Sequence, residues 1–153
     1  MSDKKTKTGM EYIANYLLAL QEKQNEFNSE DSDIIVYRGH ADESYEFKPS
    51  LFRNGNEKIY QQEAEILRKL EVERPNEFSG LKTFDKLVKM QDYNFATRIL
   101  DVTSNPLVAL YFAAQRSSLN ANGTVTICRI PQEFVNYFDD SPVISLANVI
   151  AGV

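Results

Sequence analysis

Apolar residues recur at spacings of three and four residues in three segments of the chain, a pattern typical of helices that bury one face. The first segment follows a capping box formed by Thr8 and Glu11 and runs to Leu20. The second spans about residues 57–73, and the third spans about residues 81–93. The sequence therefore predicts three helices, each with one face packed inward.

Other patterns predict two strands and a fourth helix. Residues 34–37 and 124–130 are short runs rich in β-branched side chains, as in strands. Asn105 and Pro106 suit the N-cap and the first position of a fourth helix, which residues 107–114 continue. Because this segment is apolar on every side, we expect it to be enclosed as the central helix.

These elements predict an α+β fold with four or more helices packed around a small sheet. The chain has 153 residues, about the size of one ordinary domain, and we expect residues 1–153 to form a single domain. Within it, the second strand and a C-terminal extension would occupy residues 123–153. We find no internal repeat in the sequence.

Charge and composition narrow the classes of function. The formal net charge of -5 argues against a broad nucleic-acid surface, which would need clustered Lys and Arg. The one cysteine, Cys128, cannot form an internal disulfide or hold a metal by itself, which suits a reducing compartment. No apolar run is long enough for a membrane span. We expect a cytoplasmic protein with no metal site and no membrane contact.

One carboxylate is predicted to point into the core. Glu63 lies four residues after Ile59 and four before Leu67, on the apolar face of the second helix. Burying an ionised carboxylate without a partner is costly, so a cation should meet it. The candidate partners are Arg38, Arg53 and Arg98.

Several motifs follow one another in a fixed order through the middle of the chain. They are Val36-Tyr-Arg-Gly39, Lys48-Pro-Ser-Leu-Phe-Arg53, Met90-Gln91, Thr97-Arg-Ile-Leu-Asp-Val-Thr103 and Asn105-Pro-Leu-Val-Ala-Leu-Tyr-Phe-Ala113. Over about residues 34–113 they resemble the FRG domain family of bacterial and phage proteins. The chain departs from that family at Asp92, where a histidine is usual, and at Val102, where a tryptophan is usual. A further family segment would fall after Val153.

A second similarity concerns chemistry. Tyr37-Arg38-Gly39 and Thr103-Ser104 are similar to two of the three motifs of arginine-serine-glutamate ADP-ribosyltransferases. That similarity implies an arginine that holds NAD phosphate and a hydroxyl that orders the site. The third motif, a glutamate pair after the second strand, is missing, and Glu63 could replace it only if the fold brings it to Arg38.

The polar residues of these motifs form the candidate site, and several of them also have a structural interpretation. Arg38 and Glu63 could form a core ion pair, Thr103 and Ser104 could cap the following helix, and Arg98 could pair with nearby Asp101. His40, the only histidine, is expected to face solvent in a loop. The ligand-binding candidates are Arg38, Arg53, Glu63, Gln91, Arg98, Asp101, Thr103 and Ser104.

Two functions remain open from the sequence. The first is a short, non-catalytic FRG protein that binds a protein partner, for example a phage or mobile-element inhibitor of a host factor. It needs no cofactor. Its contact surface would be an uncharged stripe of Val143, Leu146, Ile150 and Val153, which could also join two copies. The alternative is an ADP-ribosyltransferase-like enzyme or toxin that binds NAD at a polar cluster of Arg38, Glu63 and Arg98.

Overall fold

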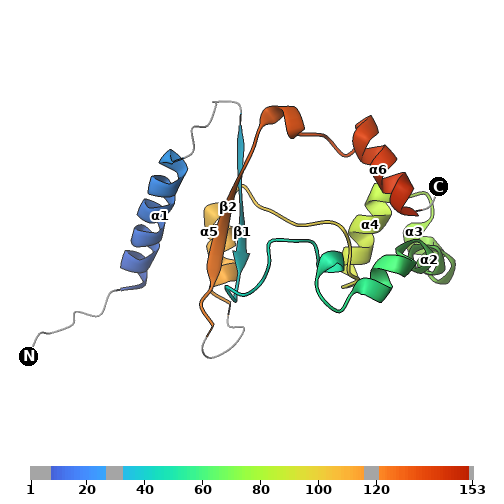
Figure 1. The fold of residues 1–153 in the computed structure, drawn as a ribbon, viewed down its shortest axis with the longest axis horizontal. Coiled ribbons are helices and arrows are strands. Elements are labelled where there is room, and N and C mark those ends of the chain that lie inside the picture. Colours follow the sequence, from blue (N-terminus) through green and yellow to red (C-terminus); the bar gives the residue numbers. More distant parts are fainter. Residues whose placement is uncertain (1–7, 27–32, 116–120, 152–153) are drawn as a thin grey trace, which may run out of the picture.

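The computed structural model describes residues 8–26, 33–115 and 121–151 of the chain. These residues form six α-helices and one two-stranded antiparallel sheet, so the predicted α+β fold is confirmed (Figure 1). The elements are α1 (Gly9–Asn25), β1 (Ile34–His40), α2 (Glu57–Glu73), α3 (Pro75–Phe78), α4 (Thr83–Asp92), α5 (Pro106–Ala113), β2 (Thr124–Ile130) and α6 (Ser141–Ala151), with 3-10 turns η1 (Ser50–Phe52) and η2 (Gln132–Phe134).

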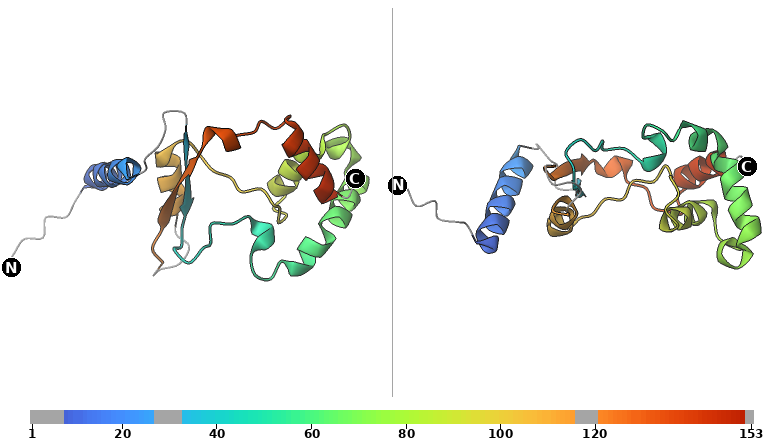
Figure 2. Two further views of the ribbon diagram at one scale, coloured as in Figure 1. Left: turned by 45° about the horizontal axis from the view of Figure 1, so that its top comes forward. Right: turned by 90° about the horizontal axis from the view of Figure 1, so that it is seen from below.

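The elements gather in two groups with separate hydrophobic cores. The sheet lies with α5 and α1 at one end of the molecule, and α2, α3, α4 and α6 lie at the other (Figure 1). The same two groups are visible in two further views of the molecule (Figure 2). Residues 41–56, 93–105 and 131–140 connect them. The single domain over residues 1–153 stays a prediction.

Two glycines allow the sheet to approach α5 closely. Strand β1 pairs with β2 from Ile34 opposite Ile130 to His40 opposite Thr124. A Cβ atom on Gly39 would lie 1.8 Å from the backbone oxygen of Ala109, and one on Gly123 would lie 1.9 Å from that of Ala113. No side chain fits in either place. Helix and sheet therefore pack backbone against backbone.

The prediction that α5 is enclosed is wrong. Only its small residues Ala109 and Ala113 are buried, against the sheet. The large apolar side chains on its other sides are exposed; they are Leu107, Val108, Tyr111 and Phe112. The physical reason is the size of the sheet, because two strands cover one side of a helix and leave the opposite side to solvent.

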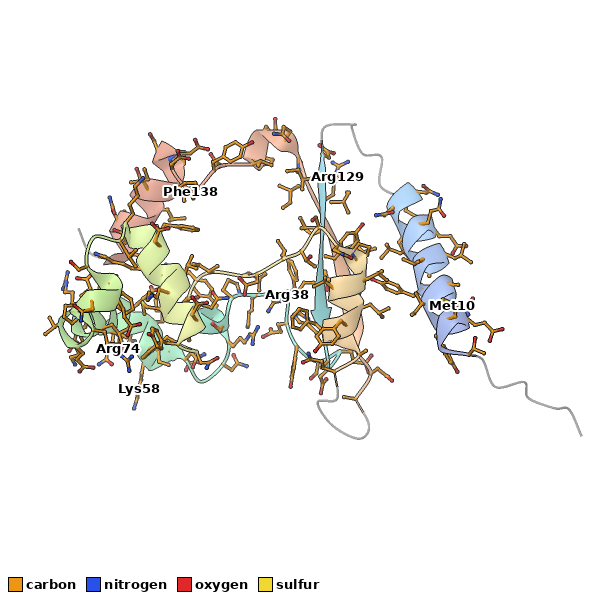
Figure 3. The ribbon with its side chains drawn as sticks, turned by 180° about the vertical axis from the view of Figure 1, so that it is seen from behind. Met10, Arg38, Lys58, Arg74, Arg129 and Phe138 are labelled. Atoms are coloured by element: carbon orange, nitrogen blue, oxygen red, sulfur yellow. The ribbon has the colours of Figure 1, made fainter. Side chains whose placement is uncertain are left out.

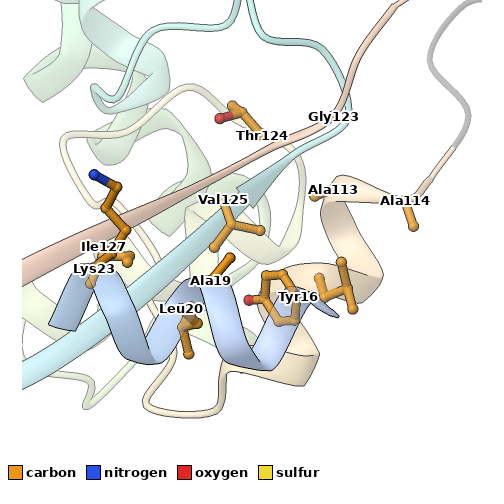
Figure 4. Close-up of a pocket in the computed structure, with 11 residues that line it drawn as sticks. Tyr16, Ala19, Leu20, Lys23, Ala113, Ala114, Gly123, Thr124, Val125 and Ile127 are labelled. Carbon is orange, nitrogen blue, oxygen red and sulfur yellow. The ribbon is translucent and has the colours of Figure 1, made fainter. Parts of the chain in front are cut away.

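Helix α1 is held against the sheet and α5 by few contacts. Its capping box is present as predicted, with Thr8 and Glu11 exchanging hydrogen bonds. Among its apolar residues only Leu20 is buried, and Tyr16 donates a hydrogen bond to the backbone oxygen of Pro106 at 2.8 Å. A cavity of about 410 Å3 lies between α1, α5 and β2, with Leu20 and Val125 among its lining residues (Figure 4). The predicted inward face of α1 is therefore only partly covered.

The second core joins α2, α3, α4 and α6. Its most buried side chains are Leu67, Phe78, Leu87 and Met90. Helix α6 adds Ala147, which is 4% exposed, and the partly buried Ile150. The small alanine side chain allows α6 to approach α4.

The face of α6 differs from the predicted stripe. Leu146 is 64% exposed and Val149 is 75% exposed, so both point away from the core that Ala147 and Ile150 join. Val153, the last residue of the stripe, lies outside the described residues. The stripe was predicted from hydrophobicity alone. The buried residue of α6 is instead Ala147, because a small side chain allows two helices to approach closely.

Candidate functional site

Glu63 has the arginine partner that the sequence predicts. It lies on the inner face of α2 with 3% of its side chain exposed, and its Oε2 accepts a hydrogen bond from Arg98 Nε at 2.6 Å. The partner is therefore Arg98, and no ion pair joins Glu63 to Arg38 among the described residues. Glu63 Oε1 is buried without a hydrogen-bond partner. One oxygen thus carries the whole interaction.

Two aromatic rings complete the surroundings of Arg98. Its guanidinium carbon lies 5.1 Å from the centre of the Tyr60 ring and 5.8 Å from that of Phe52. The negative faces of the rings favour a cation, and they screen the ion pair from water. Tyr60 comes from α2 and Phe52 from η1, so the arginine holds these two elements together.

A series of side-chain hydrogen bonds links α4 to the segment that follows it. The hydroxyl of Thr97, which is fully buried, donates to Gln91 Oε1 at 2.9 Å. The Gln91 amide then donates to the carboxylate of the exposed Asp101. Thr97 also donates its backbone N–H to the Ser50 hydroxyl at 3.1 Å. The Gln91 side chain therefore orders residues 97–101.

Arg38 lies at the junction of the two groups of elements. It extends from β1 on the side of the sheet that faces the helical group (Figure 3). Its Nε donates to His40 Nε2 at 3.0 Å, and its Nη1 donates to the backbone oxygen of Asp101. Both contacts fix the guanidinium beside the segment that connects α4 to α5.

Thr103 lies next to Arg38 because it pairs with β1. The backbones of Tyr37 and Thr103 exchange two hydrogen bonds, at 2.7 and 2.9 Å. The Thr103 hydroxyl accepts from the backbone N–H of Asn105 at 3.0 Å, and the Asn105 side chain caps α5. The cap of α5 is therefore Asn105, and the Thr103 hydroxyl stabilises the turn before the helix instead of capping it. Ser104 is exposed.

A small cavity opens beside Arg38. Its volume is about 220 Å3. The lining residues come from β1, α5 and the segment between α4 and α5; they are Tyr37, Arg38, Gly39, Asp101, Val102, Thr103, Ala109 and Phe112. Three of the eight candidate residues therefore share this cavity, while Glu63 and Arg98 line none of its wall.

Arg53 is close enough to Arg38 to alter its ionisation. Burial lowers the pKa of Arg38 most, the charge of Asp101 raises it, and the charge of Arg53 lowers it by the smallest amount. Arg53 follows η1 and makes one long hydrogen bond, from Nη2 to the backbone oxygen of Lys48 at 3.4 Å. Its Nε is buried without a partner.

The prediction for His40 is wrong. It is 5% exposed and ends β1, whereas a solvent-facing loop was predicted. Burial lowers the pKa of its imidazole first, and the charges of Arg38 and Arg53 lower it further. The signal that could have found it is the alternation along β1, in which Val36, Arg38 and His40 share one face.

A family model described as the FRG domain matches residues 33–122. The chain belongs to the FRG domain family. The match contains the predicted range of residues 34–113 and includes every candidate site residue. No curated protein matches the FRG chain, and no solved structure does either.

Two further findings on this FRG chain concern metal sites and membrane spans. Within residues 8–26, 33–115 and 121–151, no three His, Cys, Asp or Glu residues are grouped as a metal site would need. No helix in the same ranges combines the length and apolar character of a membrane span. The cytoplasmic location, the phage or mobile-element origin and the ADP-ribosyltransferase similarity stay predictions.

Proposed function

We propose that this FRG chain acts without catalysis, by binding a protein through its exposed apolar helix faces. The observation that supports this most is the outer face of α5, which consists of Leu107, Val108, Tyr111 and Phe112. Tyr111 is 64% exposed, and α5 contains no charged residue. Contiguous apolar side chains in solvent are typical of protein interfaces, and aromatic residues are enriched at their centres.

The C-terminal segment supplies a second apolar surface. Leu146 and Val149 of α6 are exposed, while Ala147 anchors the helix to the core. The proposed partner is another protein or a second copy of the chain. A phage or mobile-element inhibitor of a host factor is one form that such a function would take.

The test of this proposal is a substitution on α5 with a matched control. Leu107→Asp with Tyr111→Asp places two charges on the outer face and should abolish recovery of a stoichiometric partner from native cells. Val72→Asp is the control, because Val72 is exposed on α2, away from that face. Loss of the partner in both variants, or in neither, would contradict the proposal.

The alternative function, an ADP-ribosyltransferase-like enzyme, has weaker support. Such an enzyme needs a free carboxylate near the ribosyl cation that forms from NAD. The Glu63 carboxylate is instead buried and paired with Arg98. We therefore expect no rapid release of nicotinamide from NAD by the purified chain. Rapid release that Arg38→Ala removes would favour the enzyme.

A further inference from the structure

Arg53, directly after η1, has few partners within the chain. Its Nη2 makes one long hydrogen bond to the backbone oxygen of Lys48, at 3.4 Å, and its Nε is buried without an acceptor. No carboxylate oxygen lies within 4.0 Å of Arg53 among the described residues, in contrast to the short ion pair of Arg98. The Arg53 guanidinium therefore keeps donors for a ligand.

Arg53 lines a cavity that also contains a carboxylate. The cavity lies between η1 and the first turns of α2, and its volume of about 400 Å3 is within the range usual for small-molecule sites. Glu57 Oε1 accepts from the backbone N–H of Gly55 at 3.2 Å, and no cation lies within 4.0 Å of this carboxylate in the part of the chain that the structure describes. Two opposite charges thus share one cavity without an ion pair between them. The lining residues are Leu51, Phe52, Arg53, Glu57, Tyr60 and Gln61.

Two aromatic rings form an apolar wall of this cavity. The centres of the Phe52 and Tyr60 rings lie 5.9 Å apart, and these residues are 44% and 47% exposed. Arg98 packs against both rings and is itself held by the buried Glu63 carboxylate. The ion pair therefore holds both rings in place, while much of each ring remains open to a ligand.

We propose that this cavity binds a free α-amino acid with an aromatic side chain. The Arg53 guanidinium matches the α-carboxylate as a planar fork, and the Glu57 carboxylate attracts the α-ammonium group. The ring of the ligand would pack against Phe52 and Tyr60, since aromatic pairs gain from both buried area and ring geometry. A peptide carries its two terminal charges on separate residues, so a free amino acid matches the two charges of the cavity better. This inference is independent of the proposed protein-binding function.

The experiment is a titration of the isotope-labelled full chain with L-phenylalanine, followed by its backbone amide signals in nuclear magnetic resonance spectra. We expect saturable shifts centred on residues 51–61, which contain the cavity. N-acetyl-L-phenylalanine lacks the ammonium charge and L-phenylalaninamide lacks the carboxylate, so each should bind about 10-fold more weakly. L-alanine, which lacks the ring, should also bind more weakly than L-phenylalanine.

Matched substitutions assign each charge of the ligand to its partner. Arg53→Gln should weaken L-phenylalanine binding about 10-fold but leave L-phenylalaninamide binding unchanged, because that probe has no carboxylate. Glu57→Gln should weaken L-phenylalanine binding and leave N-acetyl-L-phenylalanine binding unchanged. The controls are Arg74→Gln and Glu65→Gln, which remove the same charges from exposed ion pairs outside the cavity and should change the affinity by less than about 2-fold. Circular dichroism checks that each variant is folded.

Several results would overturn the proposal. One is the absence of saturable L-phenylalanine binding to the unmodified chain, and another is a set of shifts centred on a different cavity. Equal affinity for L-phenylalanine and either blocked probe would show that the paired charges do not select the ligand. Unchanged affinity in folded Arg53→Gln, or L-alanine binding as tight as that of L-phenylalanine, would exclude the arginine or the ring pair from the site.

Discussion

The carboxylate of Glu63 shows how much one buried ion pair contributes to this fold. We expect Glu63→Ala to lower the free energy of unfolding by about 2–3 kcal/mol, because it leaves the Arg98 guanidinium without its counter-ion. The Arg98 side chain is 30% exposed, and water therefore moderates the loss. Urea denaturation midpoints measure it.

The control is the exposed pair between Glu65 and Lys69. Glu65→Ala should cost less than about 1 kcal/mol, as is usual for ion pairs in solvent. Equal effects of the two substitutions would show that the Glu63 pair is no stronger than a surface pair.

His40 should make the stability depend on pH. Its pKa is lowered in the folded chain, chiefly by burial, so the unfolded chain takes up a proton at a higher pH than the folded one. The stabilisation is present above the ordinary histidine pKa of about 6.5, and it decreases as the pH falls from there through the lowered pKa. Protonation would also break the bond in which His40 Nε2 accepts from Arg38.

Because His40 is the only histidine, the measurement has a direct control. The melting temperature of the unmodified chain should fall between pH 6.5 and pH 5, and that of His40→Gln should fall less. The same pH dependence in both chains would assign it to carboxylates instead.

At the scale of elements, the contact between β1 and α5 depends on the absence of a side chain at Gly39. Gly39→Ala would place a Cβ 1.8 Å from the backbone oxygen of Ala109, so strand and helix must separate. We expect a loss of about 3 kcal/mol or more in unfolding free energy, since the backbone cannot move aside as a flexible side chain would.

Gly9→Ala provides the matched substitution for this prediction. Gly9 is in α1, and a Cβ there would meet nothing within 4 Å. Alanine also favours helix over glycine, so stability should be unchanged or slightly higher. A Gly39→Ala chain as stable as Gly9→Ala would mean that β1 and α5 are not in backbone contact.

For the molecule as a whole, α6 allows assembly and folding to be tested separately. If two copies associate through the exposed side of α6, Leu146→Asp should shift sedimentation at low micromolar concentration from dimer to monomer without loss of stability. The charge would lie in an interface and outside the core. A monomer in the unmodified chain would exclude association through this face.

Ile150→Asp should behave differently, because Ile150 packs against the core of α2 and α4. A charge there would be buried, and we expect partial unfolding whether or not the chain associates. Sedimentation combined with circular dichroism distinguishes the two substitutions.

Much of the local structure could be predicted from the sequence. Helix α2 spans residues 57–73 as expected, α4 and α5 begin and end within two residues of their predicted limits, and both strands occur. The inward direction of Glu63 was also predictable. These features depend on caps, turn residues and periodicity, which act between residues close together in the chain.

Only the tertiary structure decided which residues each helix face contacts. Periodicity places Glu63 on an inner face, but the folding of residues 97–101 onto α2 selects Arg98 as its partner instead of Arg38. An apolar α5 suggests an enclosed helix, yet a sheet of two strands covers one side of it. The hydrogen bond from Arg38 to the backbone oxygen of Asp101 likewise joins segments that are 63 residues apart in the chain. Such contacts depend on distances through space, which local sequence patterns do not determine.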